Sequence, residues 1–104
     1  MNAGAAIAAA TPQDSLIVVI EYTEYGNNSP TLLYYANRRG WSLDLNSVTD
    51  HGLVQLRRQG ALFFATTIWP ELQAKHPEVA DFLLALGPQP LQGAPGGTML
   101  FRLR

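Results

Sequence analysis

The sequence predicts an α/β domain built on a short parallel sheet, and three observations lead to this fold class. Two apolar runs, Leu16–Ile20 and Ala61–Ile68, have the length and the β-branched or aromatic content of strands that are buried on both faces. Stretches with helical spacing of apolar residues separate the expected strands, and Pro and Gly residues mark their ends. A succession of strand, helix, strand, helix and strand favours parallel strands joined by right-handed crossovers.

The composition is that of one packed domain. The chain has 104 residues, of which 47% are hydrophobic and 14% charged, so it can bury a core without disulfide or metal cross-links. A net charge of -1 gives no basic face for nucleic acid, and we expect no nucleic-acid partner. The lack of cysteine in the sequence excludes disulfides, thiolate nucleophiles and Cys-ligated metals.

The N-terminal residues differ in composition from the rest of the chain. Residues 1–13 are rich in Ala and contain no Lys or Arg, so they lack the basic region of a secretory signal. They are also too short to span a bilayer. We interpret them as a disordered leader or a cloning remnant, ahead of a single α/β domain at residues 14–104. The alternative is that the chain was cut from a longer protein just after a membrane segment.

A polar loop and a helix should follow the first strand. Glu21–Ser29 contains a Gly-Asn-Asn turn signal, and its last residue would cap a helix that begins at Pro30. Arg38 and Arg39 would lie in the last turn, where positive charge suits the helix dipole. Gly40 would then end the helix in a left-handed conformation.

The second strand and second helix follow from alternation and capping. Apolar and polar residues alternate over Trp41–Leu45, which predicts a half-exposed strand at the edge of the sheet. The next helix should open at Asn46–Ser47, with Asp50 completing a partial capping box, and end at Gly60.

The C-terminal part should hold two helices and a hairpin. One helix should start at Pro70, break near His76 and give way to a second helix that starts at Pro77 and ends at Gly87. Pro88–Pro90 should form a turn, and residues 91–104 should close the sheet as a hairpin. The expected result is a two-layer or three-layer Rossmann-like domain, with a parallel strand order 2-1-3 and an antiparallel C-terminal hairpin beside the third strand.

No complete catalytic or metal-binding set can be recognised in the sequence. His51 and His76 are far apart and near expected helix ends, where a solvated or capping histidine is much commoner than a metal ligand. Gly93–Gly97 precedes a strand rather than a helix, so it indicates a turn and not a phosphate-binding loop. We therefore predict no catalytic residue, no metal and no cofactor in this chain.

Two groups of side chains are the candidates for ligand contact. Ligands of open α/β sheets bind at the carboxyl ends of the strands. That edge would gather a polar and aromatic set: Glu21, Tyr22, Asn27, Asn28, Ser29, Asp44, Asn46, Thr66, Thr67 and Trp69. The second group combines aromatic rings with arginines, which can bind sugar rings and phosphate. Its members, which we take as ligand-binding candidates together with Glu21 and Asn28, are Tyr34, Tyr35, Arg38, Arg39 and Trp41. The alternative, which packing statistics favour, is that the aromatics belong to the core and the arginines are helix-end charges.

The stretch Pro30–Trp41 (PTLLYYANRRGW), followed by Leu56–Gly60 (LRRQG) and Ala61–Ala65 (ALFFA), resembles a known family. It is similar to the soluble domain after the last membrane helix of bacterial integral-membrane glycosyltransferases, the dolichyl-phosphate-mannose-protein mannosyltransferase and aminoarabinose-transferase-like proteins. The resemblance runs from about Ser15 to the C-terminus. Family members often carry an Asp before the Pro-Thr pair, where this chain has Ser29, so no acidic role is expected there.

The resemblance implies a role without catalysis for this chain. In that family the catalytic acid lies in an early extracytoplasmic loop between membrane helices, which has no counterpart here. The implied function is a soluble accessory domain at the periplasmic face of the inner membrane, within a mannosyltransferase-like parent that uses polyprenyl-phosphate sugars. The implied partners are the transmembrane part of the same parent and the polyprenyl-phosphate sugar. The alternative is a free-standing small α/β interaction module or ligand-binding domain.

Overall fold

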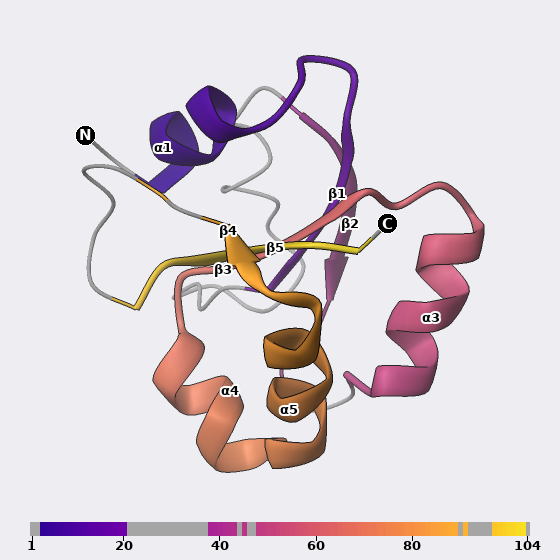
Figure 1. The fold of residues 1–104 in the computed structure, drawn as a ribbon, viewed down its shortest axis with the longest axis vertical. Coiled ribbons are helices and arrows are strands. Elements are labelled where there is room, and N and C mark those ends of the chain that lie inside the picture. The colour runs from indigo at the N-terminus through magenta and orange to yellow at the C-terminus, as the bar shows by residue number, and fades with distance from the viewer. Residues whose placement is uncertain are drawn as a thin grey trace.

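The computed structural model describes residues 3–20, 38–43, 45, 48–89, 91 and 97–103, and within them it shows a mixed α/β fold (Figure 1). The described elements in chain order are α1 (Ala3–Ala10), β1 (Leu16–Ile20), β2 (Arg39–Leu43), α3 (Asp50–Arg58), β3 (Phe63–Thr66), α4 (Trp69–Lys75), α5 (Pro77–Leu86), β4 (Pro88–Gln89) and β5 (Met99–Arg102). The α/β class predicted from the sequence is therefore confirmed.

The five strands form one open sheet in the order β2-β1-β3-β5-β4. β1 pairs in parallel with both β2 and β3, while β5 runs antiparallel to β3 and β4 antiparallel to β5. The sheet is therefore partly parallel, and β1 lies at its parallel centre. β2 is an edge strand, as its alternating sequence predicts.

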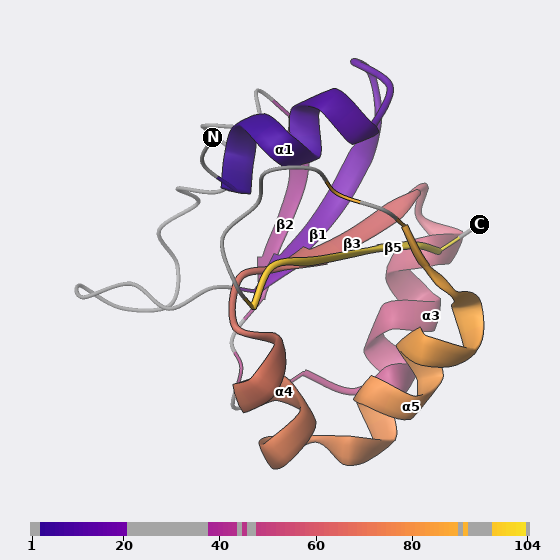
Figure 2. The ribbon, with the colours of Figure 1, turned by 60° about the vertical axis from the view of Figure 1, so that its left-hand side comes forward.

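Both faces of the sheet are covered, so the described elements form three layers. Alternate residues of β1 and β3 face opposite sides because successive side chains of a strand point in opposite directions. Val18 and Phe64 belong to a core cluster shared with the helices α3, α4 and α5, whereas Ile17 and Val19 belong to a second cluster with Ile7 of α1. Figure 2 shows α1 on one side of the sheet and the other three helices on the opposite side.

The expectation of a disordered leader does not describe residues 3–10, which form α1. Ala6 and Ile7 are 2% and 1% exposed, and Ile7 packs in the cluster that contains Ile17 and Val19. Alanine has the highest helix propensity, but a helix this short needs packing to persist. The apolar face of β1 supplies that packing, which the sequence of residues 1–13 alone does not reveal.

The Arg-Arg-Gly sequence was wrongly predicted as a helix end. Arg39 and Gly40 are the first two residues of β2, and Gly40 pairs with Ile17 of β1. A Cβ atom on Gly40 would lie 1.7 Å from the backbone oxygen of Ile17, so glycine here permits a close approach of two strands. Residues 30–37 of the expected helix lie outside the described residues.

The remaining helices agree with the sequence except at the start of α3, since α4 and α5 begin within one residue of the predicted Pro70 and Pro77. α3 begins at Asp50, and its N-cap is Thr49, whose Oγ1 accepts a hydrogen bond from the backbone N–H of Gly52 at 3.0 Å. The start expected at Asn46–Ser47 is therefore too early. The predicted break at His76 is confirmed, because α4 ends at Lys75 and α5 starts at Pro77.

The closing hairpin starts earlier than predicted. Pro88 and Gln89, expected in a turn, form β4 and pair with Phe101 and Leu100 of β5. Proline is compatible with this place because β4 is at the edge of the sheet, where one side of the strand makes no ladder hydrogen bonds. No helix in the described part of the chain is long and apolar enough to cross a membrane.

Candidate functional site: a pocket between β2 and α3

Arg38, the first candidate ligand-binding residue that the structure describes, binds the end of α1. Its guanidinium donates hydrogen bonds to Thr11 Oγ1 at 3.1 Å, to the Ala8 carbonyl at 3.0 Å and to the Thr11 carbonyl at 2.9 Å. The last carbonyls of a helix lack partners within the helix, and a cation is favoured beside them by the helix dipole. Arg38 therefore has a structural role as the C-terminal cap of α1.

Arg39 and Trp41 lie on the other face of the sheet. Residues two apart in a strand share a face, and Trp41 packs against the core cluster under α3, α4 and α5. Arg39 is exposed, whereas Arg38 is turned toward α1. The two neighbouring arginines therefore do not converge on one phosphate. The other candidates, Tyr34, Tyr35, Glu21 and Asn28, lie outside the described residues.

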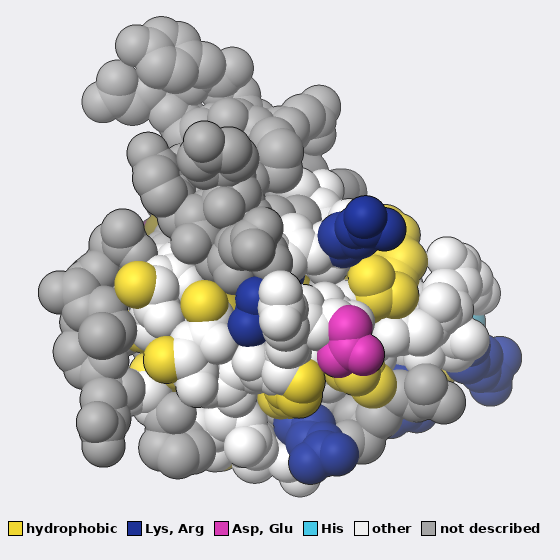
Figure 3. All heavy atoms as spheres, turned by 90° about the horizontal axis from the view of Figure 1, so that it is seen from above, with side chains coloured by type: hydrophobic (Ala, Val, Ile, Leu, Met, Phe, Trp, Pro, Cys, Tyr) yellow, Lys and Arg dark blue, Asp and Glu magenta, His cyan; other side chains and the backbone are white. Residues whose placement is uncertain are grey.

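Basic side chains are also scattered on the side of the molecule where α1 lies. Figure 3 views this side from above, and the Lys and Arg side chains visible there are separated by other atoms. The hydrophobic atoms on the same face occur in small separate spots rather than as one large area. The visible part of this face therefore gives no concentrated positive charge that would attract an anionic ligand.

At the carboxyl end of β3, the candidates of the strand-end group are used for folding. Thr66 is fully buried, and its Oγ1 accepts a hydrogen bond from the Ile68 N–H at 3.1 Å. Trp69 is buried with its ring centroid 5.1 Å from that of Phe101. These contacts position α4 below β3, and they leave Thr67 as the half-buried residue between them.

The two histidines differ in their surroundings. His76 Nε2 lies 2.6 Å from the Leu45 carbonyl, and Nδ1 lies 3.4 Å from a carboxylate oxygen of Glu78. His76 thus links the junction of α4 and α5 to the segment after β2. His51 is exposed in the first turn of α3. Among the described residues no group of three or more His, Cys, Asp or Glu is placed to hold a metal ion.

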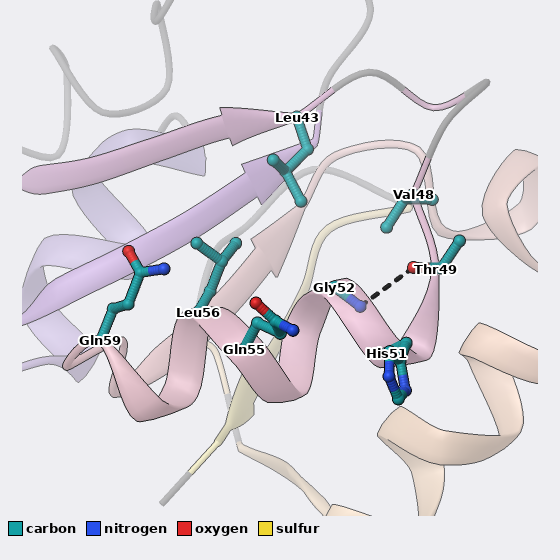
Figure 4. A pocket seen from close by; sticks show the side chains of 8 residues that line it. All are labelled: Leu43, Val48, Thr49, His51, Gly52, Gln55, Leu56 and Gln59. Carbon is teal, nitrogen blue, oxygen red and sulfur yellow. Dashed lines mark hydrogen bonds between the residues drawn. The ribbon is translucent and has the colours of Figure 1, made fainter.

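A pocket of about 480 Å³ lies between the carboxyl end of β2 and the length of α3 (Figure 4). Its lining combines three large apolar side chains with hydroxyl, amide and imidazole groups: Leu43, Val48, Thr49, His51, Gly52, Gln55, Leu56 and Gln59. Figure 4 shows Leu43 and Leu56 pointing toward one another, with Gln55 and Gln59 flanking Leu56 along the helix. The volume is within the usual range of small-molecule sites, roughly 300–1,000 Å³.

Comparisons of the chain with protein-family models, with characterised proteins and with solved structures gave no match.

Asp50 and Arg57, two of the three charged residues of α3, make contacts within the fold, whereas Arg58 is exposed directly before Gln59 in the sequence. Asp50 accepts a hydrogen bond from the His51 N–H at 2.8 Å, and Arg57 donates to the Leu103 carbonyl at 3.4 Å. Neither side chain is part of the lining. The described lining residues include no Lys, Arg, Asp or Glu, and their amide, hydroxyl and imidazole groups suit polar ligands.

Sequence reasoning missed Gln55 and Gln59. The only signal available for them is their spacing of four residues, which places both on one face of a helix. That spacing becomes informative once Leu43 is known to lie opposite them, and this depends on the position of β2 in the sheet.

Proposed function

We propose that this chain is an accessory domain without catalytic activity of its own, belonging to a bacterial membrane glycosyltransferase of the mannosyltransferase-like kind. The parent protein would use polyprenyl-phosphate sugars, and the domain would lie at the periplasmic face of the inner membrane, next to the transmembrane part of the same parent. The resemblance of Pro30–Trp41 to that family motivates the proposal. The proposal includes a Rossmann-like classification of the domain, with a parallel strand order 2-1-3. The adjacency of β2, β1 and β3 in the sheet supports that order.

The observation that carries the accessory role is the use of Arg38. This residue belongs to the stretch with the family resemblance, and its guanidinium makes three hydrogen bonds to the C-terminal end of α1. Because these hydrogen-bond donors of Arg38 hold α1 in place, we assign this residue a structural role and not a catalytic one. The family-like stretch thus leads directly from the α1 contact into β2, at the edge of the sheet.

A second candidate function is a free-standing ligand-binding module, and the β2–α3 pocket favours it. The described lining residues combine an apolar floor with amide, hydroxyl and imidazole groups, as small-molecule sites commonly do. In that case we expect the ligand to be bound without chemical change, since the described lining residues include no paired acid and base.

The genomic reading frame upstream of Met1 separates these two functions. For the accessory domain we expect an in-frame extension with several apolar segments of about 20 residues, each long enough to span a bilayer. An in-frame stop codon just before Met1 would overturn the proposal. In a purified state the chain should not turn over a polyprenyl-phosphate sugar or a nucleotide sugar, and turnover that Glu21→Gln abolishes would contradict the non-catalytic role.

A further inference from the structure

The β2–α3 pocket presents an apolar floor between groups that both donate and accept hydrogen bonds. Leu43, Val48 and Leu56 supply the apolar surface, and the amides of Gln55 and Gln59 stand on either side of Leu56. An amide side chain offers two N–H donors and one carbonyl acceptor, so it can pair with a hydroxyl group in either sense. A ligand that suits this lining has one apolar surface and several hydroxyls.

The electrostatics of the pocket disfavour an anionic ligand. The N-terminal end of α3 would attract an anion through its dipole, but the carboxylate of Asp50 already lies in the first turn and binds the His51 N–H. Of the two arginines of α3, Arg57 donates to the Leu103 carbonyl and Arg58 is exposed, and neither is among the described lining residues. A phosphate in this pocket would lose hydration without meeting a lysine or arginine among the described lining residues.

The spacing of the polar groups sets the size of the ligand. Gln55 lies on α3 and Gln59 is its C-cap, four residues later, which separates their backbone positions by about 6 Å along the helix axis. Hydroxyls on opposite sides of one six-membered sugar ring are separated by a similar length. Thr49 Oγ1 accepts from the Gly52 N–H, so its hydroxyl hydrogen points elsewhere and can donate at the other end of the pocket.

We propose that the β2–α3 pocket binds an uncharged saccharide, with the C–H face of one ring on Leu43 and Leu56 and its hydroxyls on the amides of Gln55 and Gln59. This inference rests on the proposed function for its biological setting, and it deepens that function by naming the ligand class of the domain. It places the sugar between Leu43 of β2 and the side chains of α3, and it assigns no role to a phosphate group.

A chemical-shift titration of the ¹⁵N-labelled chain tests the inference. The probes are the methyl α-glycosides of glucose and mannose, with mannose 1-phosphate and inorganic phosphate as charged probes. We expect saturable shifts at millimolar glycoside that cluster on Leu43, Gln55, Leu56 and Gln59. Mannose 1-phosphate should bind no more tightly than the methyl glycoside, and inorganic phosphate should leave these amides unshifted.

Two variants locate the contact. Replacing both amides, Gln55→Ala with Gln59→Ala, should weaken glycoside binding about tenfold, because each lost hydrogen bond removes part of the binding free energy. Gln59→Glu keeps the shape of the side chain but removes its donors, and it should also weaken binding. The matched control is Gln73→Ala on α4, an exposed amide outside the pocket lining, which should bind as the unchanged chain does.

The inference is overturned if the folded chain shows no saturable shift with either glycoside, or if inorganic phosphate alone shifts the same amides. Equal binding by the double variant and the unchanged chain overturns it as well. The titration results do not decide whether the proposed function is correct. A domain that binds no glycoside but is encoded behind membrane segments loses only this inference, whereas a reading frame that begins at Met1 removes the parent enzyme without altering the titration.

Discussion

At the scale of single residues, the neighbouring arginines Arg38 and Arg39 show how adjacent identical side chains acquire different roles. Arg38 is partly buried and donates to Thr11 and Ala8, while Arg39 is exposed at the start of an edge strand. The strand period of two separates them, because consecutive side chains point to opposite faces. The pair therefore does not act as one cationic unit.

This difference predicts unequal losses of stability. Arg38→Ala leaves the carbonyls of Ala8 and Thr11 without their charged donor, so we expect the free energy of unfolding to fall by about 1.5–3 kcal/mol. Arg39→Ala removes an exposed charge and should change it by no more than about 0.5 kcal/mol. Urea denaturation followed by circular dichroism measures both variants. Equal losses for the two substitutions would show that Arg38 does not hold α1 to the sheet.

At the scale of elements, β2 requires a glycine at position 40, although the local sequence predicts that Gly40 ends a helix. A Cβ atom at Gly40 would lie 1.7 Å from the Ile17 oxygen, and the backbone of β1 has to move to accommodate it. We expect Gly40→Ala to lower the free energy of unfolding by about 3 kcal/mol, at the upper end for an overpacked site. Amide exchange should then show weaker protection of the β1–β2 hydrogen bonds than of the β1–β3 bonds.

Ser42 provides the control for this substitution within the same strand. Its Oγ is buried and has no hydrogen-bond partner among the described residues. Ser42→Ala removes a polar atom that burial separates from water, so it should leave stability unchanged or raise it by about 1 kcal/mol. A loss with Ser42→Ala as large as that with Gly40→Ala would indicate a general sensitivity of β2 rather than a backbone clash.

Elements were predictable from the sequence where local and long-range signals agree. The run Leu16–Ile20 is apolar on both faces and becomes a strand covered on both faces, and Pro70 and Pro77 start helices because proline suits a first turn. The Arg-Arg-Gly sequence failed because its helix-end signal is overridden by pairing of Gly40 with Ile17. Pairing partners this far apart in sequence leave no local trace.

The candidate site was less predictable than the fold for the same physical reason. A pocket requires residues from different elements, and its apolar side chains Leu43 and Leu56 look like ordinary core residues in the sequence. The amides of Gln55 and Gln59 look like ordinary residues of a solvated helix face. Their meeting across β2 and α3 depends on the order of the sheet, which sequence reasoning gave only in outline.

At the scale of the whole molecule, α1 completes the third layer of the fold, and its removal should unfold or loosen the protein. Ile7 and Ala6 cover the face of β1 that carries Ile17 and Val19, and burial of one such aliphatic side chain stabilises a fold by about 1.5–3 kcal/mol. Deleting residues 1–11 also removes all three hydrogen-bond acceptors of Arg38 that belong to Ala8 and Thr11. Domains of this size have total stabilities of about 5–15 kcal/mol, so these losses are a large fraction of the total.

We expect the truncated chain to show a lower urea midpoint and to bind the dye ANS through the exposed face of β1. Ala10→Ser, at an exposed position of the same helix, is the matched control and should behave as the unchanged chain. A disordered leader would make the truncation neutral, so an unchanged midpoint without dye binding would contradict the packing of α1 on the sheet.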